Sequence, residues 1–296
     1  MSDRLALILE SRAVLRARGA DTRAFLQGMI SNDIEKLSAT RALWSAFLTP
    51  QGKFLHEFFL SLDPEDPEAI LIDCEAARRD DLKRRLSLYK LRSKVAFEDT
   101  GADFAVAVLF GAGAAEALGL PEDPGAAAPF AGGTAYIDPR LAELGARAIL
   151  PKAKADSALR EAGFAAAAPE DYDRLRISLG VPDGSRDLEV ERSPLLENGF
   201  DELHGVDWDK GCFMGQELTA RTKYRALIKK RLVPVEIEGP VPAPGTPVTR
   251  DGKDVGTLRS SAAGLGLALL RLDALGDDLT AGEARLTPRK PAWANF

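Results

Sequence analysis

Short apolar runs separated by turn residues dominate the first half of the chain, and they predict strands mixed with helices. Apolar residues at helical spacing predict one helix near 22–30, capped by Asp21, and another near 76–89. Residues 50–52 predict a hairpin turn, and the stretch 118–133, rich in Ala, Gly and Pro, predicts an irregular loop. Because strands and helices do not alternate strictly, the pattern indicates an α+β architecture. The strand candidates lie at residues 42–48, 54–62, 70–73, 95–98 and 104–110.

From residue 230 onward the pattern changes to short strands alone. A strong hairpin turn at Asp251-Gly252 and a stretch rich in Pro and Gly at 239–245 separate these strands. We therefore predict a body over residues 1–229, followed by a small C-terminal β-barrel over residues 230–296. The barrel strands are expected at residues 232–237, 247–250, 255–260 and 264–270.

One motif concentrates the residues that thiol chemistry needs, and it runs Lys210-Gly211-Cys212-Phe213-Met214-Gly215-Gln216-Glu217. A thiolate is both a nucleophile and a metal ligand, and a nearby cation and a helix N-terminus favour it. Lys210 supplies the cation, and Gly215 is expected to cap a helix that starts with Gln216 and Glu217. We therefore predict that Cys212 is the functional thiol and that Lys210 lowers its pKa.

Other interpretations of the cysteines and histidines stand beside this one. A lone cysteine is usually a small buried hydrophobic residue, and Cys74, at the end of an apolar run, fits that interpretation. Cys212 differs because its neighbours are polar, charged and glycine-rich. A pair of Cys212 with His204 is an alternative nucleophile and base, although no third orienting group is evident. The two cysteines and two histidines are too scattered for a structural zinc or iron–sulfur site within the chain.

The cysteine motif closely resembles the signature of the YgfZ-type folate-binding proteins. These proteins are relatives of the glycine-cleavage T-protein (an aminomethyltransferase) and act in iron–sulfur cluster assembly. The resemblance implies a T-protein-like fold, in which interleaved α+β domains form a folate-binding body and a C-terminal β-barrel follows. The likeness extends along most of the chain, through residues 25–33, 48–53, 89–95, 196–200 and 229–231.

The resemblance also implies tetrahydrofolate, or a folate derivative, as a cofactor. Residues 209–231 hold seven cations and two carboxylates, an excess of +5 in a protein of net charge −6. Such a charge run is usually a solvated helix face, but beside a candidate thiol it suits the carboxylates of a folate tail. The predicted folate-binding residues are Asn32, Asp33, Gln216, Glu217, Arg221 and Lys223.

Two features of true T-proteins are missing from this chain. The stretch that matches their catalytic aspartate is 51–57, which has no aspartate, and Ser178 stands where a pterin-binding glutamate is expected. A carboxylate that handles a proton cannot be replaced by leucine or serine without loss of that role. We therefore predict a folate-binding accessory factor for iron–sulfur cluster assembly that depends on Cys212, rather than an enzyme. The alternative is a folate-dependent aminomethyltransferase or demethylase-type enzyme, in which His56 or Glu57 would transfer protons.

Charge and cysteine usage limit the partners and the compartment. An RNA-binding module is a further alternative, but the basic segment offers only Tyr224 for base stacking, and the net negative charge opposes nucleic acid and acidic membranes. No apolar run approaches the ~20 residues of a membrane span. Two distant cysteines and no leader-like N-terminal pattern predict a cytoplasmic monomer, whose partners are folate and iron–sulfur client or assembly proteins. Cys212 would supply at most one transient cluster ligand, because such clusters normally need four.

Overall fold

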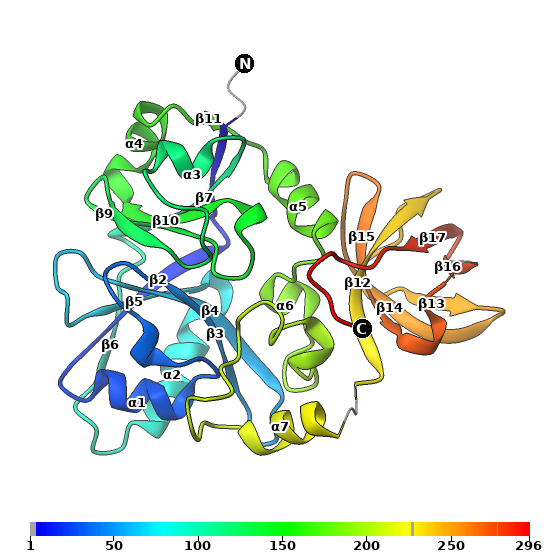
Figure 1. Cartoon of the computed structure of the whole chain (residues 1–296), viewed down its shortest axis with the longest axis horizontal. Coiled ribbons are helices and arrows are strands. Elements are labelled where there is room, and N and C mark those ends of the chain that lie inside the picture. The colour runs from blue at the N-terminus through cyan, green and yellow to red at the C-terminus, as the bar shows by residue number, and fades with distance from the viewer. Residues whose placement is uncertain (1–3, 226–227, 277) are drawn as a thin grey trace. The chain divides into compact units, whose positions relative to one another are not determined.

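The computed structural model describes residues 4–225, 228–276 and 278–296, and the chain forms two compact units (Figure 1). Unit 1 comprises the residues up to Leu48, His56–Pro169 and His204–Met214. Unit 2 comprises Thr49–Leu55, Glu170–Leu203 and the residues from Gly215 onward. Each unit is therefore assembled from segments that lie far apart in the sequence.

A five-stranded sheet in unit 1 contains, in spatial order, β3 (Leu43–Leu48), β4 (Phe54–Leu62), β5 (Ile70–Glu75), β2 (Arg12–Arg18) and β6 (Ala96–Asp99). Both faces of β4 and β5 are buried, which explains why their sequences are continuous apolar runs. The predicted helices are α1 (Thr22–Met29) and α2 (Arg79–Tyr89), and each buries an apolar stripe, such as Leu82 and Leu86 of α2. The strands and helices predicted over this part of the chain are confirmed. Asp21 stands at the N-cap position of α1, but its side chain makes no capping bond and accepts from the Lys94 amide at 2.7 Å.

The second sheet of unit 1 has six strands, β11 (Ala165–Ala166), β1 (Arg4–Ile8), β7 (Phe104–Gly111), β10 (Ala146–Pro151), β9 (Gly133–Ile137) and β8 (Ala127–Phe130), in that spatial order. β1 pairs in parallel with β11, and the other recorded pairs are antiparallel. The stretch 118–133 is not wholly irregular as predicted, because β8 lies within it. Ala131 and Gly132 both adopt positive φ values, which closes the hairpin from β8 to β9. This sheet is accompanied by α3 (Ala114–Ala117) and α4 (Ala155–Glu161).

Unit 2 contains a closed β-barrel, which begins at Lys230. Its strands, in order around the barrel, are β12 (Lys230–Glu238), β15 (Leu265–Arg271), β14 (Lys253–Ala262), β13 (Pro247–Arg250), β16 (Leu279–Ala281) and β17 (Ala284–Pro288). The predicted Asp251-Gly252 turn is confirmed, with φ of 51° and 72°, as a two-residue turn with positive φ at both positions requires. Closure leaves the barrel without a free strand edge.

Short helices complete the two units. The helices of the second half are α5 (Pro169–Ser178), α6 (Gly184–Asp187) and α7 (Gln216–Tyr224). The 3₁₀ turns are Ile34–Lys36, Ala76–Arg78, Ala142–Leu144, Lys152–Lys154, Leu196–Asn198 and Leu272–Ala274. No helix in the described part of the chain is both long and apolar enough to span a membrane.

The turn between β3 and β4 brings two glycines of unit 2 together. The amide of Gly52 donates to the carbonyl of Thr49 at 2.9 Å, and Gly52 has φ +67°. A Cβ atom on Gly52 would lie 2.8 Å from the carbonyl oxygen of Gly215, the residue before α7. Glycine is therefore required here by both the backbone conformation and the close approach of the second chain segment.

We expect Gly52→Ala to lower the free energy of unfolding by about 3 kcal/mol, because it adds a steric clash to the cost of a left-handed alanine. Gly252→Ala is the matched control. Gly252 has φ +72° and no atom within 4 Å of its added Cβ, so its loss should be only about 1 kcal/mol. Urea unfolding of both variants measures the difference, and equal losses would contradict the close contact.

Candidate functional site

The two cysteines lie in opposite environments, as their sequence contexts predict. Cys212 is exposed on the loop that precedes α7. Cys74 is buried in β5, and this burial raises its pKa to about 12. Because the thiolate is the reactive form of cysteine, only the Cys212 thiol is accessible to a metal ion, a cluster or an electrophile in the folded protein.

Lys210 anchors the cysteine loop to the end of α1 within unit 1. Its ammonium donates to the backbone carbonyls of Gln27 (2.7 Å), Ile30 (2.6 Å) and Asn32 (2.7 Å). It also lies 5.2 Å from the ring centroid of Phe213. Burial lowers the pKa of Lys210 to about 8.

Lys210 has a structural role that the motif alone does not show. An ammonium has three N–H donors, and the three carbonyls accept from all of them. No donor remains for a hydrogen bond to the thiolate of Cys212 in this conformation. Lys210 acts instead on the backbone, because its bonds fix the loop two residues before the cysteine.

Further hydrogen bonds hold the same loop on residues 27–32. The amide of Met214 donates to the carbonyl of Gly28 at 3.0 Å, and the Gln27 side chain donates to the carbonyl of Lys210 at 3.2 Å. The carboxylate of Asp207 forms an ion pair with Lys36. Cys212 is thus an exposed side chain on a backbone that is fixed on both sides.

Asn32 and Asp33, which were predicted to bind folate, hold backbone segments together in this structure. The side-chain amide nitrogen (Nδ2) of Asn32 donates to the carbonyls of Trp44 and His204, both at 2.7 Å. A carboxylate oxygen of Asp33 accepts from the Gln27 side chain at 2.8 Å and from the Glu35 amide at 3.1 Å. Their polar atoms satisfy backbone groups that the sequence pattern does not reveal.

The other predicted folate residues lie on α7, in unit 2. The helix begins at Gln216 after Gly215, which has φ +82°, so the predicted helix start is confirmed. Glu217 is exposed and pairs with Arg221 at 3.3 Å. Lys223 is exposed on the same helix, so α7 presents cationic side chains to solvent.

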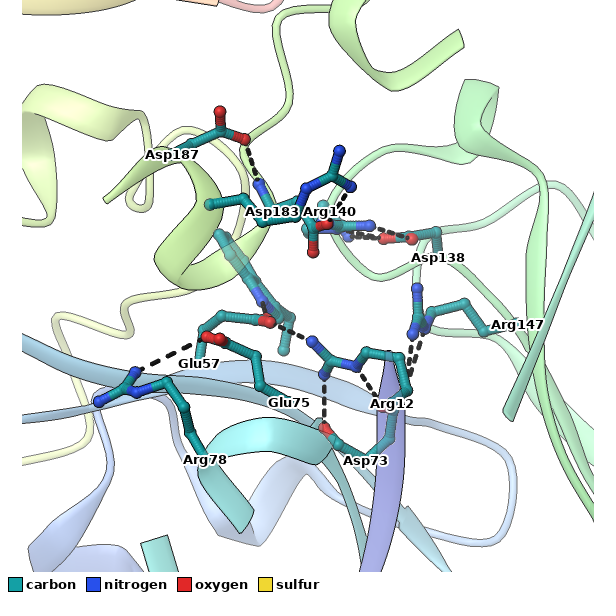
Figure 2. Close-up of polar contacts among 12 residues, drawn as sticks. Arg12, Glu57, Asp73, Glu75, Arg78, Asp138, Arg140, Arg147, Asp183 and Asp187 are labelled. Carbon is teal, nitrogen blue, oxygen red and sulfur yellow. Dashed lines mark hydrogen bonds and ion pairs between the residues drawn. The ribbon is translucent and has the colours of Figure 1, made fainter. Parts of the chain in front are cut away.

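A network of buried charges at the centre of unit 1 was not predicted (Figure 2). Arg12 donates from Nε to Asp73 at 2.6 Å and forms a second ion pair with Glu57. The opposite oxygen of Asp73 accepts from Arg147 at 2.6 Å, and that of Glu57 accepts from the Trp44 indole at 2.6 Å. Both carboxylates therefore have donors on each oxygen. The only signal in the sequence is a charged residue inside an apolar strand, as in Ile-Leu-Ile-Asp-Cys.

An aromatic ring joins this network to a second buried ion pair. Arg140 bonds to Asp138 at 2.7 Å. The guanidinium carbons of Arg140 and Arg147 lie 4.8 and 3.8 Å from the ring centroid of Phe59. With Arg12, Glu57 and Asp73 included, three arginines face three carboxylates, so the centre of unit 1 is electrically balanced.

His56 and Glu57, the candidate proton carriers, are both engaged in the fold. Glu57 belongs to the buried network. His56 bonds to Asp81 at 3.1 Å and stacks on Phe47 with ring centroids 6.5 Å apart. Burial, followed by the positive charge of Arg78, lowers the pKa of His56 to about 4.

In unit 2, Glu197 is a carboxylate of a different kind. It is half-buried on the turn Leu196–Asn198, and burial raises its pKa. Among the described residues no hydrogen bond or ion pair is recorded for it. The turn is held by Arg231, which donates to the carbonyl of Leu196 at 2.8 Å. No three Cys, His, Asp or Glu side chains of the described residues are grouped as metal ligands.

Comparisons with known proteins agree with this architecture. A family model described as the CAF17 C-terminal beta-barrel domain matches residues 229–296. The crystal structure of glycine cleavage system aminomethyltransferase T from Bartonella henselae superposes with a TM-score of 0.78 at 12% identity, over 99% of this chain and 87% of that one. The predicted α+β, aminomethyltransferase-like fold with a C-terminal β-barrel is confirmed.

Two curated relatives match along most of their length. The mouse protein named "Iron-sulfur cluster assembly factor IBA57, mitochondrial" is 33% identical over 294 residues, covering 90% of this chain and 77% of its own. The human protein of the same name is 34% identical over 278 residues, covering 88% and 76%.

The predicted cytoplasmic location is wrong by this comparison, because both relatives are named mitochondrial. The prediction depended on cysteine usage and on the N-terminal pattern. Cysteine usage indicates only that a compartment is reducing, and receptors read a targeting signal independently of the fold.

We expect His56 to make stability fall as the pH drops from 6.5 to 4. The unfolded histidine takes up a proton near pH 6.5, whereas the folded one resists until about pH 4, so its stabilising contribution is complete above 6.5 and lost below. The loss amounts to about 3 kcal/mol. Urea unfolding at several pH values should show a flatter profile for His56→Gln. His204→Gln, which alters an exposed histidine, should retain the wild-type slope.

Proposed function

The chain belongs to the family of the iron–sulfur cluster assembly factors named IBA57, and on this premise we propose that it assists cluster assembly through the thiol of Cys212. The YgfZ-type signature pointed to a related family with the same general role. The single observation that supports the proposal is the exposed cysteine on a loop fixed by Lys210.

The cluster would be cargo that this chain shares with a partner protein. A thiolate from Cys212 supplies one iron ligand, and a cluster normally takes four. The described residues offer no group of further ligands around it. A partner must therefore provide the others, and the fixed loop keeps the thiol accessible while it does so.

An aminomethyltransferase or demethylase activity receives less support. Such a reaction needs a carboxylate or imidazole that can exchange a proton with a substrate. Glu57 is paired with Arg12 and accepts a hydrogen bond from the Trp44 indole, and His56 is buried against Asp81. The likeness to aminomethyltransferase T concerns the fold alone.

Folate binding is a second proposal, and the residues of unit 2 fit it better than those of unit 1. A pterin ring presents N–H donors and needs an acceptor that is not already paired. The buried carboxylates of unit 1 are saturated, whereas Glu197 of unit 2 is half-buried with no recorded partner among the described residues. The exposed cations Arg221 and Lys223, in the same unit, suit the anionic tail.

We expect Cys212→Ala to fail to restore iron–sulfur enzyme activity in cells that lack the protein, because the exposed cluster ligand is gone. Cys74→Ala, the matched control, should restore it. Thiol titration with Ellman's reagent on the folded proteins should detect Cys212 alone in the wild type and no fast thiol in Cys212→Ala. Full restoration by a folded Cys212→Ala protein would overturn the proposal.

We expect Glu197→Gln to weaken tetrahydrofolate binding by about tenfold, because a charged acceptor for the pterin becomes neutral. Asp33→Asn should leave affinity unchanged, because Asp33 serves the backbone. Calorimetric titration measures both variants. Absence of binding by the wild type would remove the folate proposal and leave the role of Cys212 intact.

A further inference from the structure

A cluster of apolar side chains lies exposed where α2 ends, in unit 1. Leu88 is 64% exposed, Tyr89 42% and Leu91 87%. Leu82 and Leu86 form the buried stripe of α2, and the half-exposed ring of Tyr89 packs edge-on against the buried Phe47 with centroids 6.0 Å apart. Leu88 and Leu91 are additional to this packing. Exposed cations surround them. We call this patch the Leu91 surface, and it consists of Arg84, Leu88, Tyr89, Leu91, Arg92 and Lys94.

The backbone holds Leu91 in an unfavourable conformation. Its φ is +44°, in the left-handed region that leucine rarely adopts. The surrounding loop is fixed by hydrogen bonds from the Ser93 amide to the Lys90 carbonyl at 2.7 Å and from the Lys94 amide to Asp21 at 2.7 Å. A left-handed residue commonly follows the end of a helix, and here it presents an almost fully exposed leucine on a loop that these bonds hold in place.

The charge of this region is opposite to that of the protein. Residues 82–94 contain six cations and no carboxylate, whereas the whole chain has a net charge of −6. An acidic partner is therefore attracted to this surface and repelled by much of the rest. Aromatic, aliphatic and arginine side chains together are the usual components of a protein-binding site.

Helix α1 links the Leu91 surface to the cysteine loop. Asp21, just before α1, bonds to the Lys94 backbone, and the carbonyls of Gln27 and Gly28 near its other end bond to Lys210 and Met214. α1 has eight residues and is therefore about 12 Å long. A protein that docks on the Leu91 surface needs to extend only about that distance along unit 1 to meet the loop of Cys212.

We propose that the Leu91 surface is the docking site for an acidic protein with exposed apolar side chains, the partner that supplies the remaining cluster ligands. This inference rests on the proposed function of Cys212. A protein is favoured over RNA because Tyr89 is the one aromatic ring on the surface for base stacking. A membrane of anionic lipid would be attracted by the same cations, and the vesicle titration below distinguishes it from a protein.

The test measures fluorescence anisotropy of a labelled peptide in which aspartates flank a leucine and a phenylalanine. A second peptide replaces the two apolar residues with serine, and oligouridylate and phosphatidylglycerol vesicles serve as the other probes. We expect the wild type to bind the first peptide best. Leu91→Asp should weaken that binding at least about tenfold, because the apolar contact is lost and a like charge is added.

Two further variants separate docking from folding. Leu91→Gly removes the side chain and relieves the left-handed strain, so it should weaken peptide binding without lowering the midpoint of thermal unfolding. Val241→Asp changes another exposed apolar side chain, 57% exposed in unit 2, and should bind like the wild type.

The inference is overturned if both Leu91 variants keep wild-type affinity, if the serine peptide binds equally well, or if RNA or vesicles bind more tightly than the peptide. Cys212→Ala should bind the peptide normally. A failure of the docking site is therefore seen in the peptide titration, whereas a failure of the proposed function is seen in the cell-restoration assay.

Discussion

The two sheets of unit 1 are joined through one buried carboxylate, Asp73 of β5. Arg12 of the same sheet bonds to one of its oxygens, and Arg147 of the six-stranded sheet bonds to the other. A buried ion pair adds little net stability, because desolvation offsets the attraction, but loss of one partner leaves an uncompensated charge. The network therefore restricts how the sheets pack more than it strengthens them. Glu57, at the other end of Arg12, is fixed by the same constraint.

The proposed chemistry of this chain lies at the surface of its aminomethyltransferase-like fold, away from the buried charges. Arg12, Arg140 and Arg147 balance Glu57, Asp73 and Asp138, and the guanidinium groups of Arg140 and Arg147 both lie against the ring of Phe59. The accessible thiol and the Leu91 surface both lie outside that centre. Lys210 is a similar case. Three backbone carbonyls stabilise its half-buried ammonium, and these bonds in turn hold the cysteine loop in place.

Local patterns in the sequence were sufficient to predict the helices, strands and turns. They were not sufficient to predict the contacts between segments that lie far apart along the chain. The turn at Asp251-Gly252, the helix start at Gln216 and the contrast between Cys74 and Cys212 all depend on neighbouring residues, and all could be predicted. Lys210 is different, because its carbonyl partners lie about 180 positions away along the chain. A charged residue inside an apolar strand, such as Arg12 or Asp73, indicates that a buried partner of opposite charge exists. The sequence does not show which residue that partner is. The sequence likewise gives no sign of the bond from the Asn32 side chain to the carbonyl of His204, which lies 172 positions away.

The alternation of the chain between the units has a consequence for synthesis on the ribosome. Ser31, Asn32 and Lys36 are made early, yet their partners lie in the segment His204–Met214, between 171 and 174 positions later. Unit 1 therefore cannot be completed until more than two thirds of the 296 residues have been translated. A nascent chain must keep the end of α1 unpaired throughout that interval, which is when exposed polar backbone and apolar strands are most open to misfolding. Co-translational folding of unit 1 therefore depends on the last of its three segments to be made, His204–Met214.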